Sequence, residues 1–439
     1  MVDVLQVVLA YVAADVLQVA HITVLAHVED AEEDVGIAIK MMSSKYYMIQ
    51  IADHNNSWQE GSSKEITFIV TKDCQLACKY CYLVGKNSHG RMSFDIAQKA
   101  VDYILSHEFH WYFNQKSVIW DFIGGEPFLE IELIDKICDY IKKEMYRLNH
   151  HWFDSYRFSF STNGLTYSSD KVQKFIDKNK KHLSIGITID GTQRKHDLNR
   201  IYKSDGRGSY RDVVKNIPLW LEQFPNEGTK VTISSADIPY ITESVLHLFS
   251  LGIHQININC VFENVWNSGD DKLFEDQLIE LADNMIDREL YKTNSCSFFD
   301  EGIGKPLDKN INNENWCGAG KMLSVDADGY FYPCTRFAQY SLRDKKAWIL
   351  GNVYNGIDEN KLRPFFLLNR TSQSPMKCIE CEVASGCSWC QAENFDSADT
   401  YTLYQRSTAI CLMHKARVRA NNYYWNKLYR TIELKELKR

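Results

Sequence analysis

Three cysteines stand close together, Cys74, Cys78 and Cys81, with three and then two residues between them. A strand-like run over residues 65–71 leads directly into them. Three thiolates on one short loop can hold three irons of a 4Fe–4S cluster and leave the fourth iron open, whereas four cysteines close the cluster of an electron-transfer ferredoxin. An open iron is a place to bind and reduce another molecule. The alternative is a zinc knuckle, but structural zinc takes four ligands, typically in CxxC pairs, and no fourth ligand lies close by in the sequence.

This spacing, with the aromatic Tyr80 directly before the third cysteine, resembles the signature of the radical S-adenosylmethionine (SAM) superfamily. The resemblance implies that the open iron chelates the amino and carboxylate groups of SAM. It also implies that an electron from the cluster cleaves SAM to a 5′-deoxyadenosyl radical. In this interpretation Cys74, Cys78 and Cys81 are both metal ligands and catalytic residues.

A glycine-rich turn follows the second strand-like run, which ends in Gly124, Gly125, Glu126 and Pro127. Two glycines let backbone approach a ligand closely, and a carboxylate can accept hydrogen bonds from an ammonium. A motif of this shape follows the second strand in the radical SAM family and binds the amino group of SAM. The resemblance therefore assigns these four residues to the cofactor. The alternative is an ordinary tight turn before a helix.

Polar residues also follow the third and fourth strand-like runs. Ser161 and Asn163 suit the ribose hydroxyls or the carboxylate of SAM. Asp190 is a candidate contact of the SAM ribose or of the substrate, and Arg200 can neutralise a carboxylate. Turn chemistry and surface salt bridges are the alternative for all four residues.

The C-terminal third carries a second set of cysteines, whose order and spacing resemble the SPASM domain, an extension that binds auxiliary iron–sulfur clusters. The chain departs from the family pattern once, because Cys387 and Cys390 are separated by two residues rather than three. The resemblance implies two auxiliary clusters and assigns the outer one to Cys378, Cys381, Cys387 and Cys411. It assigns the inner cluster to Cys317, Cys334 and Cys390, for which Cys296 is a candidate fourth ligand. The alternative to the two clusters is two structural zinc sites.

The elements that must position these residues alternate between strand-like and helical patterns. Ser93 is placed to cap a helix over 94–107, and apolar residues recur at helical spacing from Ile131 to Met145. Such alternation favours a parallel sheet, and the resemblance implies an α/β fold with a partial (β/α)6 barrel. Parallel barrels carry their chemistry on the loops that follow the strands. The strand-like runs cover residues 65–71, 118–123, 157–161, 183–189, 230–235 and 255–260.

The same patterns predict a division of the chain into five regions. The first, residues 1–60, is expected either to bind a leader peptide by adding it as a strand or to cap the barrel. The other regions are the radical SAM barrel over 61–265, a linking segment over 266–316, the SPASM domain over 317–415 and a C-terminal helix over 416–439.

Composition limits the possible partners and compartments. The chain has 439 residues and a net charge of −7, which argues against nucleic acid as the main partner because a basic footprint is missing. The apolar N-terminal runs lack a basic segment and are interrupted by Asp3 and Asp15, so neither a signal peptide nor a membrane helix is expected. The chain has thirteen cysteines, and their clustering as CxxxCxxC and CxxC points to metal rather than to a secreted disulfide framework, which is typical of a cytoplasmic metalloprotein.

Between residues 65 and 415 the chain resembles SPASM maturases of ribosomally made peptides. The resemblance is greatest to the ranthipeptide maturases, such as the freyrasin maturase, which act on targets with repeated Cys-x-x-x units. It implies an enzyme that forms thioether cross-links from the cysteines of a precursor peptide. It also implies SAM and three 4Fe–4S clusters as cofactors, and an external electron donor such as flavodoxin or ferredoxin. Two alternatives stay open: a sulfatase-type maturase that oxidises Cys or Ser to formylglycine, and an iron–sulfur redox protein without a SAM pocket.

Overall fold

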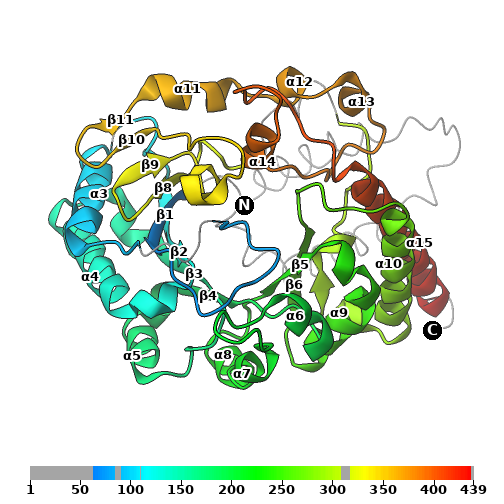
Figure 1. The fold of residues 1–439 in the computed structure, drawn as a ribbon. Coiled ribbons are helices and arrows are strands. Elements are labelled where there is room, and N and C mark those ends of the chain that lie inside the picture. Colours follow the sequence, from blue (N-terminus) through cyan, green and yellow to red (C-terminus); the bar gives the residue numbers. More distant parts are fainter. Residues whose placement is uncertain (1–62, 85–89, 109, 308–316, 437–439) are drawn as a thin grey trace, which may run out of the picture. The chain divides into compact units, whose positions relative to one another are not determined.

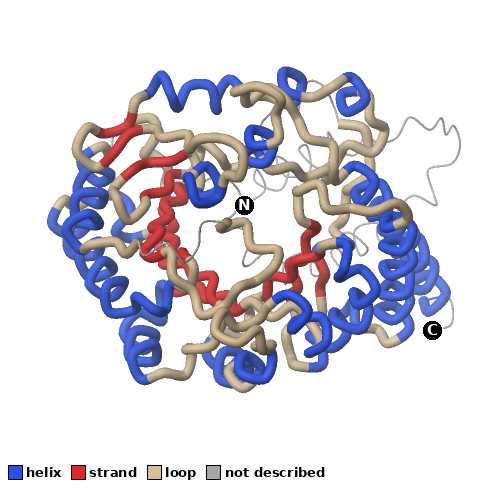
Figure 2. Tube along the Cα trace, viewed as in Figure 1, coloured by secondary structure: helices blue, strands red, loops and turns tan. Residues whose placement is uncertain are grey.

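The computed structural model describes residues 63–84, 90–108, 110–307 and 317–436. The N-terminal region predicted over residues 1–60 lies outside the described residues. Figure 1 shows an inner layer of strands with helices along its outer side. The same layering is clear in Figure 2, where the strands lie inside the helices. This is the predicted α/β partial barrel.

Four parallel strands form one part of the barrel: β1 (Ser63–Thr71), β2 (Ser117–Gly124), β3 (Tyr156–Thr162) and β4 (Leu183–Ile187). They are hydrogen-bonded in sequence order, β1 to β2, β2 to β3 and β3 to β4. The carboxyl ends of all four strands therefore lie at the same edge of the sheet, and the cysteine loop follows the first of them.

Alternating residues of these strands face either the helices or the barrel interior. Trp120, Phe122 and Phe158 are completely buried, and the ring of Phe122 stacks on a neighbouring ring of β1 at 5.6 Å. The intervening Asp121 and Ser159 are only half-buried. Burial of a large apolar side chain contributes roughly 1.5–3 kcal/mol, so the apolar face holds the strands against the helices, and the other face carries polar side chains such as Asp121 and Ser159.

The remaining barrel strands form a second parallel sheet of β5 (Thr229–Ile233), β6 (Gln255–Cys260) and β7 (Ser295–Cys296). Within the described ranges, no strand ladder joins β4 to β5. The hydroxyl of Thr229 replaces it, because Oγ1 donates to the carbonyl of Ile187 at 2.8 Å and accepts from the backbone N–H of Ile189 at 3.1 Å. All six predicted strand-like runs are thus strands, in two sheets.

Helices connect successive parallel strands. α3 (Phe94–Ser106) begins at Ser93, whose side chain accepts a hydrogen bond from the backbone of Ile96, as the capping pattern predicted. α4 (Ile131–Arg147) buries its predicted apolar stripe. The other helices of the barrel are α5 (Asp170–Asn179), α6 (Gln193–Asn199), α7 (Tyr210–Val214), α8 (Ile217–Gln223), α9 (Ile241–Ser250) and α10 (Asp270–Asp287).

The C-terminal region is joined to the barrel through the sheet. β8 (Leu323–Val325) pairs in parallel with β1 and antiparallel with β9 (Tyr330–Tyr332). No helix in the described part of the chain is long and apolar enough to cross a membrane. The remaining elements are β10 (Gly351–Asn352), β11 (Gly356–Ile357), α11 (Glu359–Leu367), α12 (Arg370–Gln373), α13 (Met376–Ile379), α14 (Gln391–Asp396) and α15 (Cys411–Glu436).

The long helix α15 begins before the boundary predicted at residue 416. Its first residue is Cys411, so the last cysteine of the predicted outer cluster lies on this helix. Farther along, Arg419 forms an ion pair with Glu275, and Lys427 with Asp283. These contacts fasten α15 to α10, which the sequence had placed in a linking segment.

Candidate active site and cluster sites

The cysteine loop lies at the carboxyl edge of β1, which is where parallel barrels carry their chemistry. Cys74 is buried, and Cys78 and Cys81 are half-buried. The backbone N–H of Ala77 donates to the carbonyl of Ile201 at 2.8 Å, so the loop is paired with the segment that follows α6. A short loop braced from outside in this way can present three sulfurs to one cluster.

The two glycines after β2 allow the turn to lie directly on the cysteine loop. A Cβ on Gly124 would lie 2.2 Å from the carbonyl oxygen of Thr71, and a Cβ on Gly125 would lie 2.1 Å from that of Asp73. The backbone N–H of Gly125 donates to the Thr71 carbonyl at 2.9 Å. The close approach that these glycines allow is to the backbone of the protein itself, and the predicted approach to a ligand stays a prediction.

Glu126 lies at the centre of this turn and is 1% exposed. Its carboxylate accepts hydrogen bonds from the Thr162 hydroxyl at 2.7 Å, the Asn163 backbone at 2.7 Å and the Phe128 backbone at 3.1 Å. Burial raises the pKa of Glu126, and these three donors oppose that effect. The carboxylate therefore links the ends of β2 and β3, and Pro127 opens the 3-10 turn that follows it.

The polar residues at the end of β3 have two different neighbours. The side-chain amide of Asn163 donates to the side-chain oxygen of Gln75 at 3.0 Å, which places Asn163 against the cysteine loop. Ser161 accepts a hydrogen bond from the ammonium of Lys230 at 2.9 Å. Lys230 is exposed and lies on β5, and nothing local in the sequence marked it as a neighbour of the predicted site.

Asp190 and Arg200 meet at Tyr80 of the cysteine loop. The phenol of Tyr80 donates to the Asp190 carboxylate, and an N–H of Arg200 donates to the phenol oxygen at 3.0 Å. Burial opposes ionisation of Asp190, but Lys195 and Arg200 outweigh it and hold its pKa below the ordinary value. Nε of Arg200 is buried without a hydrogen-bond partner among the described residues. Both residues thus brace the loop through the aromatic position of the signature.

The four cysteines of the predicted outer cluster line one cavity. They come from separate elements, since Cys378 lies on α13 and Cys411 begins α15. Burial raises the pKa of Cys387 to about 11, while the charge of Arg406 lowers it. Four sulfurs around one cavity are a donor set that fits a 4Fe–4S cluster.

The three cysteines of the predicted inner cluster also lie together. Burial raises the pKa of Cys334, and the charges of Cys317 and Cys390 raise it further. All three lie in or against a second, smaller hydrophobic core, whereas Cys296 belongs to the main core of the barrel. The groups that perturb the pKa of Cys296 are Phe298, Asp300 and Arg417 besides burial itself, and none of them is a cluster cysteine. The structure gives no support to Cys296 as a fourth ligand.

A cavity of about 720 Å³ opens beside the cysteine loop. Cys81 and Tyr82 line it from the loop, Ser234 and Glu263 from the ends of β5 and β6, and Arg343 from the cysteine-rich region. The volume is within the range of small-molecule sites. This cavity is the place where a substrate can contact both the loop and the C-terminal region.

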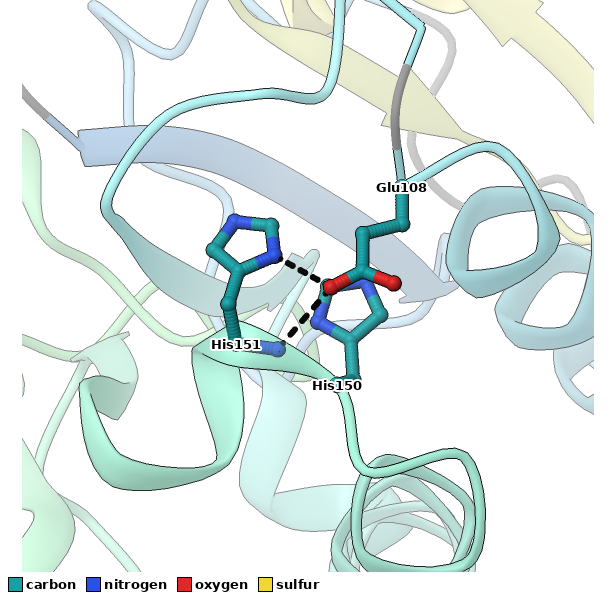
Figure 3. A group of neighbouring side chains, drawn as sticks. All are labelled: Glu108, His150 and His151. Carbon is teal, nitrogen blue, oxygen red and sulfur yellow. Dashed lines mark hydrogen bonds and ion pairs between the residues drawn. The ribbon is translucent and has the colours of Figure 1, made fainter.

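A separate group of Glu108, His150 and His151 lies at the opposite ends of the strands, before β2 and β3 (Figure 3). Its ligand atoms are within 4.8 Å of one another, which suggests a metal site. However, the two imidazole rings stack at 4.6 Å with only 19° between their planes, so one ion cannot lie in the plane of both rings. His151 instead bridges Glu108 at 2.7 Å and the Gln115 carbonyl at 2.8 Å, as a structural clamp.

Comparison with known proteins identifies the family. The model of the radical SAM superfamily matches residues 68–248. The uncharacterized protein MJ0907 of Methanocaldococcus jannaschii is 30% identical over 303 residues, which are 68% of this chain and 91% of that protein. This chain belongs to the radical SAM superfamily. It is therefore a radical SAM enzyme that uses SAM and a 4Fe–4S cluster.

Other similarities reach the C-terminal region. The serine-type anaerobic sulfatase-maturating enzyme of Bacteroides thetaiotaomicron is 21% identical over 345 residues, or 72% of this chain and 78% of that enzyme. The structure of anSMEcpe with AdoMet and the Kp18Cys peptide has a TM-score of 0.60, 20% identity, and covers 84% of this chain and 98% of that one. Streptococcus suis SuiB bound to its precursor peptide SuiA has a TM-score of 0.51, 14% identity, and covers 90% and 85%. The structural likenesses show a shared fold.

Proposed function

We propose that this radical SAM enzyme modifies a ribosomally made precursor peptide and forms thioether cross-links from the peptide's cysteines. The observation that carries the proposal is the cavity beside the cysteine loop, which is lined by both Cys81 and Arg343. A peptide in this cavity lies between the radical-generating loop and the cysteine-rich region. Solved relatives of the same fold are described with bound peptides, which supports a peptide as the substrate.

The residues of this chain have distinct roles in the proposal. Cys74, Cys78 and Cys81 hold the SAM cluster, and bound SAM supplies the radical that removes a hydrogen atom from the peptide. The turn Gly124–Pro127 after β2 and Asn163 after β3 lie next to SAM. Ser161, Asp190 and Arg200 complete that wall of the pocket, with Asp190 and Arg200 also holding Tyr80 in place.

The cysteine-rich region holds the auxiliary clusters in this proposal. Cys378, Cys381, Cys387 and Cys411 supply four thiols, a complete set for one 4Fe–4S cluster. Cys317, Cys334 and Cys390 supply three, which leaves one position for a ligand from outside the chain, such as a peptide thiolate. An external electron donor, a flavodoxin or a ferredoxin, supplies the reducing electrons.

Mass spectrometry of the peptide tests the reaction. The enzyme is co-expressed with the precursor peptide encoded beside its gene, and the variant with Ala at Cys74, Cys78 and Cys81 serves as the control. Each thioether removes two hydrogens, so the peptide loses about 2 Da per cross-link. The linked cysteine resists thiol alkylation and the link survives reductant, unlike a disulfide. An unmodified peptide, or a loss of mass that the triple variant also produces, contradicts the proposal.

A second candidate is a sulfatase-type maturase, which the similarity to the Bacteroides thetaiotaomicron enzyme favours. The same experiment separates the two reactions. Formylglycine formed from cysteine loses the sulfur and gains an aldehyde that reacts with hydrazides, whereas a thioether keeps the sulfur. A hydrazide-reactive product would therefore replace the thioether proposal with this one.

A further inference from the structure

One cysteine of the outer site, Cys387, contacts an arginine that other residues hold in place. Nη2 of Arg406 donates to Sγ of Cys387 at 3.2 Å, and Nη1 donates to the hydroxyl of Ser374 at 3.3 Å. The guanidinium also lies 4.3 Å from the centre of the Trp389 ring, and the backbone N–H of Arg406 donates to the Gln373 carbonyl at 3.1 Å. These contacts on three sides fix the charge of Arg406 directly against one sulfur of the site.

A second guanidinium lies in the same neighbourhood. Arg370 is 4% exposed and donates to the backbone carbonyls of Cys378 at 3.0 Å and Ile379 at 2.8 Å. Its Nε has no hydrogen-bond partner among the described residues. Two guanidinium groups that both contact residues of one small site repel each other, and an anion in that site offsets the repulsion.

The proposed occupant of the site has the charge that these arginines require. A 4Fe–4S cluster with four thiolate ligands is an anion, and its reduced form carries one more negative charge than its oxidised form. Hydrogen bonds to the cluster sulfurs and nearby charge are two of the means by which a protein sets a cluster potential. A cation that donates to a ligand sulfur stabilises the reduced form more than the oxidised form.

We propose that Arg406 is a positioning residue that raises the reduction potential of the outer auxiliary cluster through its bond to the Cys387 sulfur. This inference rests on the ligand set in the proposed function. Trp389 holds the guanidinium in place, and this tryptophan lies in the Cys387–Cys390 interval, which is one residue shorter than in the SPASM pattern. The outer cluster is then easier to reduce than the same cluster without Arg406, which favours it as an acceptor of electrons leaving the active site.

The test is a redox titration followed by electron paramagnetic resonance (EPR). The parent protein carries Ala at Cys74, Cys78 and Cys81, so that only the auxiliary clusters give signals. Arg406→Gln keeps a polar side chain and removes the charge. We expect this variant to lower the reduction potential of one auxiliary cluster by about 59 mV. This shift is a tenfold change in the equilibrium constant of a one-electron reduction. An unchanged potential with unchanged iron content overturns the inference.

Two further variants make the result specific. Lys377 lines the same cavity, but its ammonium bonds Thr408 at 3.2 Å rather than a sulfur, so Lys377→Gln removes one charge without removing a bond to sulfur. We expect Lys377→Gln to change the reduction potential less than Arg406→Gln does. An equal change in both variants overturns the role given to the sulfur contact. Trp389→Leu keeps the charge of Arg406 and removes the ring that holds its guanidinium in place. This variant replaces Arg406→Gln in the test if Arg406→Gln assembles no outer cluster. We expect Trp389→Leu to lower the reduction potential of the outer cluster too, and an unchanged potential overturns the inference.

A last variant separates this inference from the ligand assignment. Cys387→Ala is expected to lower the iron content and to remove one of the two auxiliary EPR signals. If both signals persist at full iron content, the ligand set in the proposed function is wrong, and the inference fails with it. If one signal is lost while Arg406→Gln still titrates like the parent, the ligand set stands and only the role of Arg406 is wrong.

Discussion

Replacement of Glu126 by glutamine removes one negative charge from a carboxylate with three donors around it. Oε1 accepts from Thr162 and from the backbone of Phe128, and Oε2 accepts from the backbone of Asn163. Glutamine offers only one oxygen, and its NH2 group must take the other position. In either orientation an NH2 group faces a backbone N–H, so the N–H of Phe128 or of Asn163 loses its acceptor.

Two separate losses follow from this geometry. A buried donor without an acceptor costs about 1–3 kcal/mol of folding stability. In addition, the proposed contact with the SAM ammonium is a charge-assisted hydrogen bond, worth about 1.5–3 kcal/mol. At ~1.4 kcal/mol per tenfold change, we expect Glu126→Gln to weaken SAM binding by about ten- to a hundredfold. Cluster assembly on the cysteine loop is expected to continue, because no cysteine ligand is changed.

Equilibrium binding of SAM to the anaerobically reconstituted protein measures the loss of the ammonium contact, and denaturant unfolding without SAM measures the loss of folding stability. Glu130→Gln is a matched control, since Glu130 is also buried in the same turn but pairs with Arg91 instead of facing the cysteine loop. It is expected to bind SAM normally. Normal SAM affinity in Glu126→Gln, at normal iron content, would refute the ammonium contact. Equal weakening in both variants would assign the effect to a damaged turn.

Three further predictions concern the loop and its supports. Alanine at Cys74, Cys78 and Cys81 should remove one cluster and all SAM cleavage, measured by iron content and 5′-deoxyadenosine release; loss of all iron from a folded variant would contradict the separate ligand sets. Gly125→Ala places a Cβ 2.1 Å from a backbone oxygen of the cysteine loop and should yield folded protein with less of this cluster than Gly186→Ala, whose Cβ meets nothing closer than 3.6 Å. Burial, aided by a nearby arginine, lowers the pKa of His196 to about 3 from 6.5. The unfolded chain therefore takes up this proton first as the pH falls below 6.5, and native stability falls by about 2 kcal/mol between pH 7 and pH 5. The difference in unfolding free energy between the wild type and His196→Asn should shrink by that amount, and a difference independent of pH would show that this histidine does not titrate as described.

The sequence by itself determined those features that depend on neighbouring residues. Three thiols within eight residues lie on one short stretch of chain, and the resemblance of the Cys74, Cys78 and Cys81 spacing to the radical SAM signature was enough to predict the family. The strands were equally predictable from the sequence. Alternation such as that of Trp120, Asp121 and Phe122 places apolar side chains on one face of a strand, whichever strand it pairs with. Six such runs separated by helical patterns favoured a parallel sheet, and the family resemblance implied the α/β partial barrel.

The tertiary structure decided what depends on residues far apart in the chain. Tyr80 meets Asp190 and Arg200, which are 110 and 120 residues away, and neither pairing follows from a local pattern. Gly125 shows the same limit, because a glycine allows a close approach of the backbone but does not identify the residue approached, which is Asp73. Such contacts depend on the register and crossing of strands, which are set by packing over the whole barrel. A motif therefore determines the chemistry that a loop can perform, and the fold determines which distant side chains hold that loop in position.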